Sequence, residues 1–295
     1  MSKYFDETQR AEDWLAREGA AKRQDISTVI ENIRKPASVT PEDVVQEADV
    51  PGLPELEIAI PGARKIHLSS ITDPSIVVGG KESRHHATEA YRALRTRLMR
   101  LQSSKGIRSV AVSSAAPGDG KTVTTLNLGL CYAQLHDTPV LLIDCDLRSR
   151  RLSQVLGNPP APGLAEVLSG EASYEEAVVA TNNPNLYVLP GGSMMVSAPE
   201  LLSSNTWKEL IAWCNEKFRL ILIDTPPVRP LADFELIAAG CDAFLMVVRA
   251  HQTQREALQQ LAGQIDSKKL AGVVLNSAET YSKSGYSNSY AYYQG

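Results

Sequence analysis

The sequence has little cysteine and no long hydrophobic run, and each shortage excludes a class of protein. The four cysteines are widely spaced and form no C-x-x-C pair, so neither a disulfide framework nor a zinc site is expected. The longest apolar candidate, residues 236–248, contains Asp242 and is shorter than the ~18 residues that span a bilayer. The polar, acidic N-terminus has no signal-peptide core. We therefore expect a soluble cytoplasmic protein, for which any role at a membrane must come through a partner.

The chain also lacks an excess of charge of one sign. Its 30 Lys and Arg against 34 Asp and Glu give a formal net charge of −4, which excludes a strongly basic nucleic-acid binder. No nucleic-acid partner is expected.

Phenylalanine and tryptophan are scarce, whereas tyrosine is not. There are 4 Phe, 3 Trp and 10 Tyr, and five of the tyrosines fall in the last 15 residues. A buried core would spread its aromatic residues along the chain, so this cluster needs another explanation. Its members are Tyr281, Tyr286, Tyr290, Tyr292 and Tyr293.

Composition divides the chain into four parts. Residues 1–35 are expected to be a helical or flexible extension with only a weak apolar stripe. Residues 36–80 hold six of the 17 prolines and are expected to form an extended linker, because proline fixes φ and disfavours helix in the preceding residue. Residues 81–278 carry the regular patterns of one domain, and residues 279–295 form a flexible, tyrosine-rich tail.

Within residues 81–278, short apolar runs alternate with helical patterns. Continuous Val, Ile and Leu runs are typical of strands covered on both faces, and strand–helix alternation predicts a mostly parallel sheet. We therefore predict a three-layer α/β fold, with helices on both faces of a mostly parallel central sheet. The expected strands are 107–112, 140–143, 186–189, 220–223, 243–248 and 272–275, and the expected helices are 91–101, 122–135, 207–218 and 253–265.

A glycine-containing loop follows the first of these strands. Gly118 and Gly120 let the backbone curl so that N–H groups point at an anion, and the following helix adds the positive end of its dipole. Lys121 would reach the β- and γ-phosphates and Thr122 would bind Mg²⁺. A strand, this loop and a helix in that order place the predicted fold in the P-loop NTPase class. The loop departs from G-x-x-x-x-G-K-[ST] at its first position, Ala115. The residues expected to bind ATP here are Ala116, Pro117, Gly118, Asp119, Gly120, Lys121, Thr122 and Val123.

Acidic residues end two further strands. Asp144 and Asp146 follow one strand and Asp224 follows another, and ligands of open parallel sheets bind beyond the carboxyl ends of the strands. Three carboxylates beside a polyphosphate would repel it unless Mg²⁺ lay between them. Asp146 and Asp224 are therefore expected, with Thr122, to hold the metal. Asp144 and Asp146 would divide between them the roles of orienting the attacking nucleophile and holding the metal. Arg148 would stabilise transition-state charge or pair with Asp146.

These residues leave the phosphoryl acceptor open. Water would make the protein an ATPase switch, and a side-chain hydroxyl would make it a kinase.

At this point the motifs together resemble a known family. The Ala-Ala-Pro-Gly-Asp-Gly-Lys-Thr loop, Asp144-x-Asp146-x-Arg148, Ile-Asp-Thr-Pro-Pro at 223–227 and the terminal tyrosines are similar to the bacterial tyrosine kinases of capsule and exopolysaccharide synthesis. The resemblance covers roughly residues 75–295 and includes Ser-Ala-Pro-Glu-Leu-Leu at 197–202. Related nucleotide folds also place an adenine-reading Asn where Asn276 stands, although a turn Asn is equally natural there.

The resemblance implies Mg-ATP-dependent autophosphorylation of the tail in trans, with Asp144 as the base. It also implies a ring of subunits joined through a helix like Glu89-x-x-Arg92-x-x-Arg95. Without the resemblance, this spacing would favour a solvated helix face with a local ion pair. The implied partners are a separate membrane-embedded polysaccharide co-polymerase, which would recruit the chain to the inner face of the plasma membrane, and a cognate tyrosine phosphatase.

Two other functions compete with this one. The first is a Mg-ATP-switched positioning ATPase, most of whose relatives carry a lysine where this chain has Ala116. The second is a non-catalytic regulatory subunit, against which the intact acidic and phosphate-loop motifs argue.

Overall fold

The computed structural model describes the greater part of the chain from residue 60 onward. The two terminal segments lie outside it, and with them the predicted extension 1–35 and tail 279–295. The described residues are 60, 63–68, 71, 73–78, 85–193, 198–228, 231–254, 258 and 265–277.

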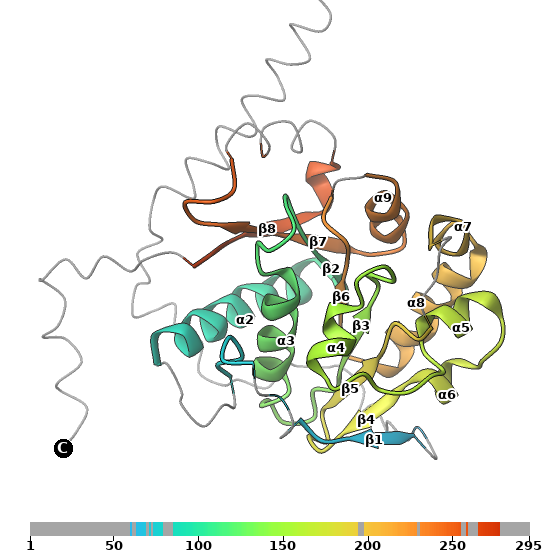
Figure 1. The fold of residues 1–295 in the computed structure, drawn as a ribbon. Helices are drawn as coiled ribbons and strands as arrows, with labels where there is room; N and C mark the ends of the chain where they lie inside the picture. The colour runs from blue at the N-terminus through green and yellow to red at the C-terminus, as the bar shows by residue number, and fades with distance from the viewer. Residues whose placement is uncertain are drawn as a thin grey trace, which may run out of the picture.

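One eight-stranded sheet organises the fold, in the order β1-β4-β5-β3-β6-β2-β7-β8. Figure 1 shows it running from β8 at the top of the view to β1 at the bottom. All neighbouring strands are parallel except β4 and β5. The strands are β1 Arg64–Ile66, β2 Ser109–Ser114, β3 Val140–Asp144, β4 Val179–Thr181, β5 Leu186–Leu189, β6 Leu220–Asp224, β7 Ala243–Arg249 and β8 Leu270–Asn276.

Helices cover both faces of this sheet, as the apolar runs predict. Residues that alternate along the central strands enter two separate cores. One core packs the sheet against α5, α8 and α9, and the other packs it against α2, α3 and α4. The predicted three-layer α/β fold is therefore confirmed. The helices are α2 His85–Lys105, α3 Lys121–Tyr132, α4 Arg151–Val155, α5 Leu164–Ser169, α6 Tyr174–Ala177, α7 Ala198–Leu202, α8 Asn205–Lys217, α9 Leu231–Ala239 and the 3₁₀ turn η3 Ser267–Lys269.

The six predicted strands all exist, with small shifts at their ends. The largest shift is in β2, which begins and ends two residues later than the apolar run suggests. Its last residues, Ser113 and Ser114, are polar but fully buried, because their hydroxyls donate to the carbonyls of Pro226 at 2.9 Å and Ala116 at 2.8 Å. The predicted helix 253–265 falls largely outside the described residues.

Two strands were not predicted, and one of them lies in the segment expected to be a linker. β1 pairs with β4, and Arg64 lies opposite Val179. Part of the segment 36–80 is therefore a strand of the sheet and not an extended linker. The side chain of Arg64 secures β1 by donating to carbonyls of the 160–162 turn, including that of Pro162 at 2.6 Å. Three-residue strands carry too little apolar pattern to be recognised in a sequence. Among the described residues, none of the helices is both long and apolar enough to cross a bilayer.

Candidate active site

The loop between β2 and α3 is shaped by its own side chains. Gly118 and Gly120 have φ of 87° and 100°, a region that L side chains rarely adopt. Within the loop, the carboxylate Oδ2 of Asp119 accepts the N–H of Ala116 at 2.9 Å. Asp119 is only 3% exposed. This inward-turned carboxylate closes the loop in the curled form that an anion cradle requires.

The ends of β7 and β8 hold the loop from outside. Thr253 donates its hydroxyl to Asp119 Oδ1 at 2.9 Å, and Arg249 donates to the carbonyl of Gly118 at 3.1 Å. Asn276 donates its amide to the carbonyl of Asp119 at 2.8 Å and packs where a side chain on Gly120 would lie. Contact with adenine remains a prediction for Asn276, whose amide here positions the loop.

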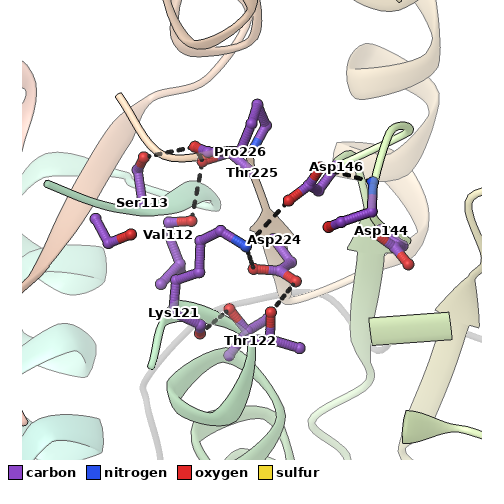
Figure 2. A network of polar contacts seen from close by, with 12 residues as sticks. Val112, Ser113, Lys121, Thr122, Asp144, Asp146, Asp224, Thr225 and Pro226 are labelled. Atoms are coloured by element: carbon purple, nitrogen blue, oxygen red, sulfur yellow. Dashed lines mark hydrogen bonds and ion pairs between the residues drawn. The ribbon is translucent and has the colours of Figure 1, made fainter. Parts of the chain in front are cut away.

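Helix α3 begins with the two predicted phosphate-site residues. Figure 2 shows Lys121 reaching toward Asp146 and Asp224, with Thr122 beneath them. The ammonium of Lys121 is 3.1 Å from Asp146 Oδ2 and 3.9 Å from Asp224 Oδ1. Thr122 donates its hydroxyl to Asp224 Oδ2 at 2.7 Å. The residues predicted from three separate motifs therefore meet at one place.

Sheet register explains why they meet. β3 and β6 are neighbours in which Asp144 lies opposite Asp224, and β6 is also paired with β2, whose end starts the phosphate loop. Thr225, just past β6, donates its hydroxyl to the carbonyl of Val112 in β2 at 3.0 Å, a contact visible in Figure 2. Three parallel strands thus deliver their polar carboxyl ends to the same edge.

Burial changes the protonation of two of these carboxylates. Burial raises the pKa of Asp224 to about 7, although the nearby ammonium of Lys121 and the hydroxyl of Thr122 oppose the rise. Burial also raises the pKa of Asp144 to about 6, against hydrogen bonds from Ser153. Desolvation disfavours the charged form of a carboxyl group, so both side chains gain affinity for a proton.

Arg148 does not pair with Asp146, which was one of its two predicted roles. Its guanidinium is 3.1 Å from Oδ2 of Asp233 in the first turn of α9, while Asp146 pairs with Lys121. The side chain of Asp233 is 6% exposed and that of Arg148 is 56% exposed. Arg148 therefore pairs with the buried carboxylate of Asp233, because leaving that buried charge without a partner would be costly.

The predicted metal ligands fit a magnesium ion bound together with phosphates. No group of three His, Cys, Asp or Glu among the described residues is arranged to hold a metal by itself. Magnesium in nucleotide sites usually takes only one or two carboxylates, with phosphates and water completing its shell. Oδ1 of Asp224 is buried and has no hydrogen-bond partner within the described chain, so this oxygen is available to a cation. Thr122 and Asp146 lie beside it.

The predicted oligomer residues divide into two environments on α2. Glu89 and Arg92 form an exposed ion pair at 2.5 Å. Arg95 instead turns inward, where its guanidinium donates to the carbonyl of Cys131 in α3 at 2.9 Å. The outward pair has the exposure that a contact between subunits needs, whereas Arg95 joins two helices of the same chain.

Several functional candidates carried no recognisable signal in the sequence. Ser153 contacts Asp144, Asp233 contacts Arg148, and Thr253 contacts Asp119. Serine, aspartate and threonine are common at helix starts and turns, so only the tertiary structure distinguishes these three. The five tail tyrosines and Ser197 of the 197–202 segment lie outside the described residues.

Comparison with known proteins covers this whole site. A family model described as an AAA domain matches residues 107–276, from β2 to Asn276, and supports nucleotide use by the phosphate loop. The tyrosine-protein kinase YwqD of Bacillus subtilis (strain 168) is 31% identical over 212 residues, covering 71% of this chain and 89% of that protein. The tyrosine-protein kinase ptk of Acinetobacter johnsonii is 34% identical over 212 residues, covering 71% of this chain but 29% of that protein.

Solved structures agree with the sequence relatives. The kinase domain of the Escherichia coli tyrosine kinase ETK superposes with a TM-score of 0.62 at 26% identity, covering 70% of this chain and 82% of that one. The chimerical protein CapA2B2 superposes with a TM-score of 0.61 at 25% identity, covering 73% of this chain and 93% of that one.

Proposed function

This chain belongs to the bacterial tyrosine-protein kinases, and we propose that it transfers the γ-phosphoryl group of ATP to tyrosines of its own C-terminal tail, in trans. The observation that carries the proposal is the convergence of Lys121 and Thr122 with Asp146 and Asp224. Asp144 lies opposite Asp224 on the neighbouring strand, and the chain carries five tyrosines clustered in its last 15 residues. A positioning ATPase has no use for such a tail.

Phosphoryl transfer asks a protein mainly for positioning and charge neutralisation. The phosphate loop would hold the phosphates with its backbone N–H groups and Lys121. Thr122, Asp146 and Asp224 would hold Mg²⁺, which neutralises phosphate charge when bound. Lys121 lies against Asp146 and Asp224, so the same side chain offsets negative charge in the site and offers a cation to the nucleotide.

Asp144 is the residue we assign as the base. A tyrosine hydroxyl with a pKa near 10 must give up its proton as its oxygen bonds to phosphorus. The raised pKa of Asp144, about 6, brings this carboxylate closer to the operating pH than an exposed aspartate and so improves it as a proton acceptor. The bond from the γ-phosphorus to the bridging oxygen breaks in the same step, and ADP leaves with the electron pair.

A neighbouring chain is the source of the acceptor. About 15 extended residues span roughly 50 Å, which lets the tail reach the site of an adjacent subunit. The exposed Glu89–Arg92 pair on α2 supplies a contact surface for a ring of such subunits. Five phosphates would add roughly −8 to −10 charges to a chain already at −4, so phosphorylation should repel the tail from the acidic pocket and loosen the ring.

Membership of the family supports a proposal for the cellular setting. We place the protein at the inner face of the plasma membrane, recruited by a separate membrane-embedded polysaccharide co-polymerase and reset by a tyrosine phosphatase. Its phosphorylation cycle would then regulate the polymerisation and export of a capsular or extracellular polysaccharide.

Peptide mapping tests the activity itself. Purified protein is incubated with Mg-ATP and digested, and phosphate is sought on the peptide containing residues 281–293. We expect modification in the wild type and in Lys208→Met, a control on the exposed face of α8, and none in Lys121→Met. ATP hydrolysis with an unmodified tail would instead favour the positioning ATPase.

A further inference from the structure

A buried serine, Ser153, hydrogen-bonds one carboxylate oxygen of Asp144, the proposed base. Ser153, in the short helix α4, donates both its backbone N–H and its hydroxyl to Oδ2 of Asp144, at 2.7 Å and 2.6 Å. The same hydroxyl accepts the N–H of Gly191, just past β5, at 3.0 Å. Ser153 is 5% exposed and Asp144 is fully buried.

The direction of these hydrogen bonds fixes the orientation of the Asp144 carboxylate. A serine hydroxyl has a single proton, and because Gly191 donates to its oxygen, that proton is directed at Asp144. Two donors from one residue therefore converge on one carboxylate oxygen, which sets the rotation of the group about its Cβ–Cγ bond. Charge-assisted hydrogen bonds of this kind are short and strong.

The second oxygen of Asp144 is left open. Oδ1 is buried and has no hydrogen-bond partner in the part of the chain that the structure describes. Leaving a buried acceptor unpaired is costly, so an aspartate with only a structural role would have both oxygens satisfied. Asp119 is such a case, since Oδ1 accepts from Thr253 and Oδ2 accepts from Ala116.

We infer that Ser153 is a positioning residue for phosphoryl transfer, which holds Asp144 so that Oδ1 is presented to the acceptor hydroxyl. The inference rests on the proposed function. In the transfer step, the tyrosine O–H proton moves to Asp144 Oδ1 while the tyrosine oxygen bonds to the γ-phosphorus and ADP leaves. Ser153 touches neither reactant and loses no proton.

The neighbouring glycines keep the hydroxyl in place. A Cβ on Gly191 would lie 3.1 Å from the side chain of Arg150, and Arg150 donates to the carbonyl of Gly192 at 2.6 Å. The turn after β5 is therefore fastened to the start of α4, which keeps the N–H of Gly191 directed at Ser153. The positioning device joins two segments that meet only in the folded protein.

Steady-state kinetics of tail phosphorylation tests the role. We expect Ser153→Ala to lower kcat about tenfold to a hundredfold, the loss of a hydrogen bond to a charged group, with KM for ATP unchanged. Ser153→Thr keeps the hydroxyl and should recover most of kcat. Ser104→Ala, at an exposed position near the end of α2, is the control and should match the wild type.

Two further variants separate positioning from folding. In an Asp144→Asn background, Ser153→Ala should lower kcat no further, because the serine acts only through that carboxylate. The inference is overturned if Ser153→Ala keeps wild-type kcat, if it alters only KM or the melting temperature, or if its effect multiplies with that of Asp144→Asn. If wild-type protein leaves its tail unmodified, the proposed function itself fails, which is a distinguishable result.

Discussion

Replacing Asp224 by asparagine should stop phosphoryl transfer and at the same time stabilise the fold. Asp224 has no solvent exposure, and one of its oxygens lacks a hydrogen-bond partner within the described residues. Burial raises its pKa from 3.8 to about 7. Above about pH 7 the native protein therefore holds a buried charge that the unfolded chain carries at far lower cost.

The sign and size follow from linkage between protonation and folding. Because the neutral carboxyl is favoured in the folded state, wild-type stability falls as pH rises from about 4 to about 7. A shift of roughly three pKa units at about 1.4 kcal/mol each amounts to about 4 kcal/mol at pH 8. At pH 5 the folded group is largely protonated and the penalty is about 2 kcal/mol. Asparagine, which stays neutral, removes both penalties.

Urea unfolding of Asp224→Asn and wild type at pH 5 and pH 8 measures this difference. Trp207, which is 1% exposed in the native protein, provides a fluorescence signal for unfolding. We expect the variant to be more stable by about 2 kcal/mol at pH 5 and about 4 kcal/mol at pH 8, or roughly 8–16 °C in melting temperature at the higher pH. Glu216→Gln, on the exposed face of α8, is the matched control and should show no such pH dependence.

Two outcomes would refute the reasoning. If Asp224→Asn is less stable than wild type at pH 8, the contacts with Lys121 and Thr122 outweigh the cost of burying the charge. If the stability difference between variant and wild type is the same at both pH values, the pKa of Asp224 does not differ between the folded and unfolded states as the account requires.

Three other variants test the phosphate loop and helix α2. Gly120→Ala should weaken ATP binding by at least tenfold in a nucleotide titration. The reason is that the new Cβ would lie 2.0 Å from Asn276 Nδ2, at a residue whose φ is 100°. ATP binding within twofold of wild type would contradict the loop geometry. Arg92→Ala should lower the native mass of the assembly and leave melting unchanged, whereas Arg95→Ala should lower the melting temperature by roughly 2–4 °C through loss of its bond to Cys131. Equal effects of the two arginine variants on both readouts would contradict this division.

The sequence predicted the sheet and the converging motifs because both depend on local pattern. Apolar runs identify β3 and β6, and parallel strands bring Asp144 and Asp224 to one edge without further information. The positions of Lys121 and Thr122 follow equally, since a helix begins directly after the loop.

Features that depend on distant packing were not predictable. Ser153 becomes a partner of Asp144 only when α4 folds back onto the end of β3. The pairing of Arg148 with Asp233 depends on where α9 starts, and a pairing with Asp146 was equally consistent with the sequence. β1 was missed because prolines surround it and its three residues gain their place only by pairing with β4.

A mixing experiment tests the central claim that one chain phosphorylates the tail of another. Full-length Lys121→Met protein, inactive but with an intact tail, is incubated with Mg-ATP and with active protein whose five tail tyrosines are changed to phenylalanine. We predict phosphate on the tail of the inactive chain. An unmodified tail in this mixture, under conditions where wild-type protein phosphorylates itself, would contradict transfer between chains.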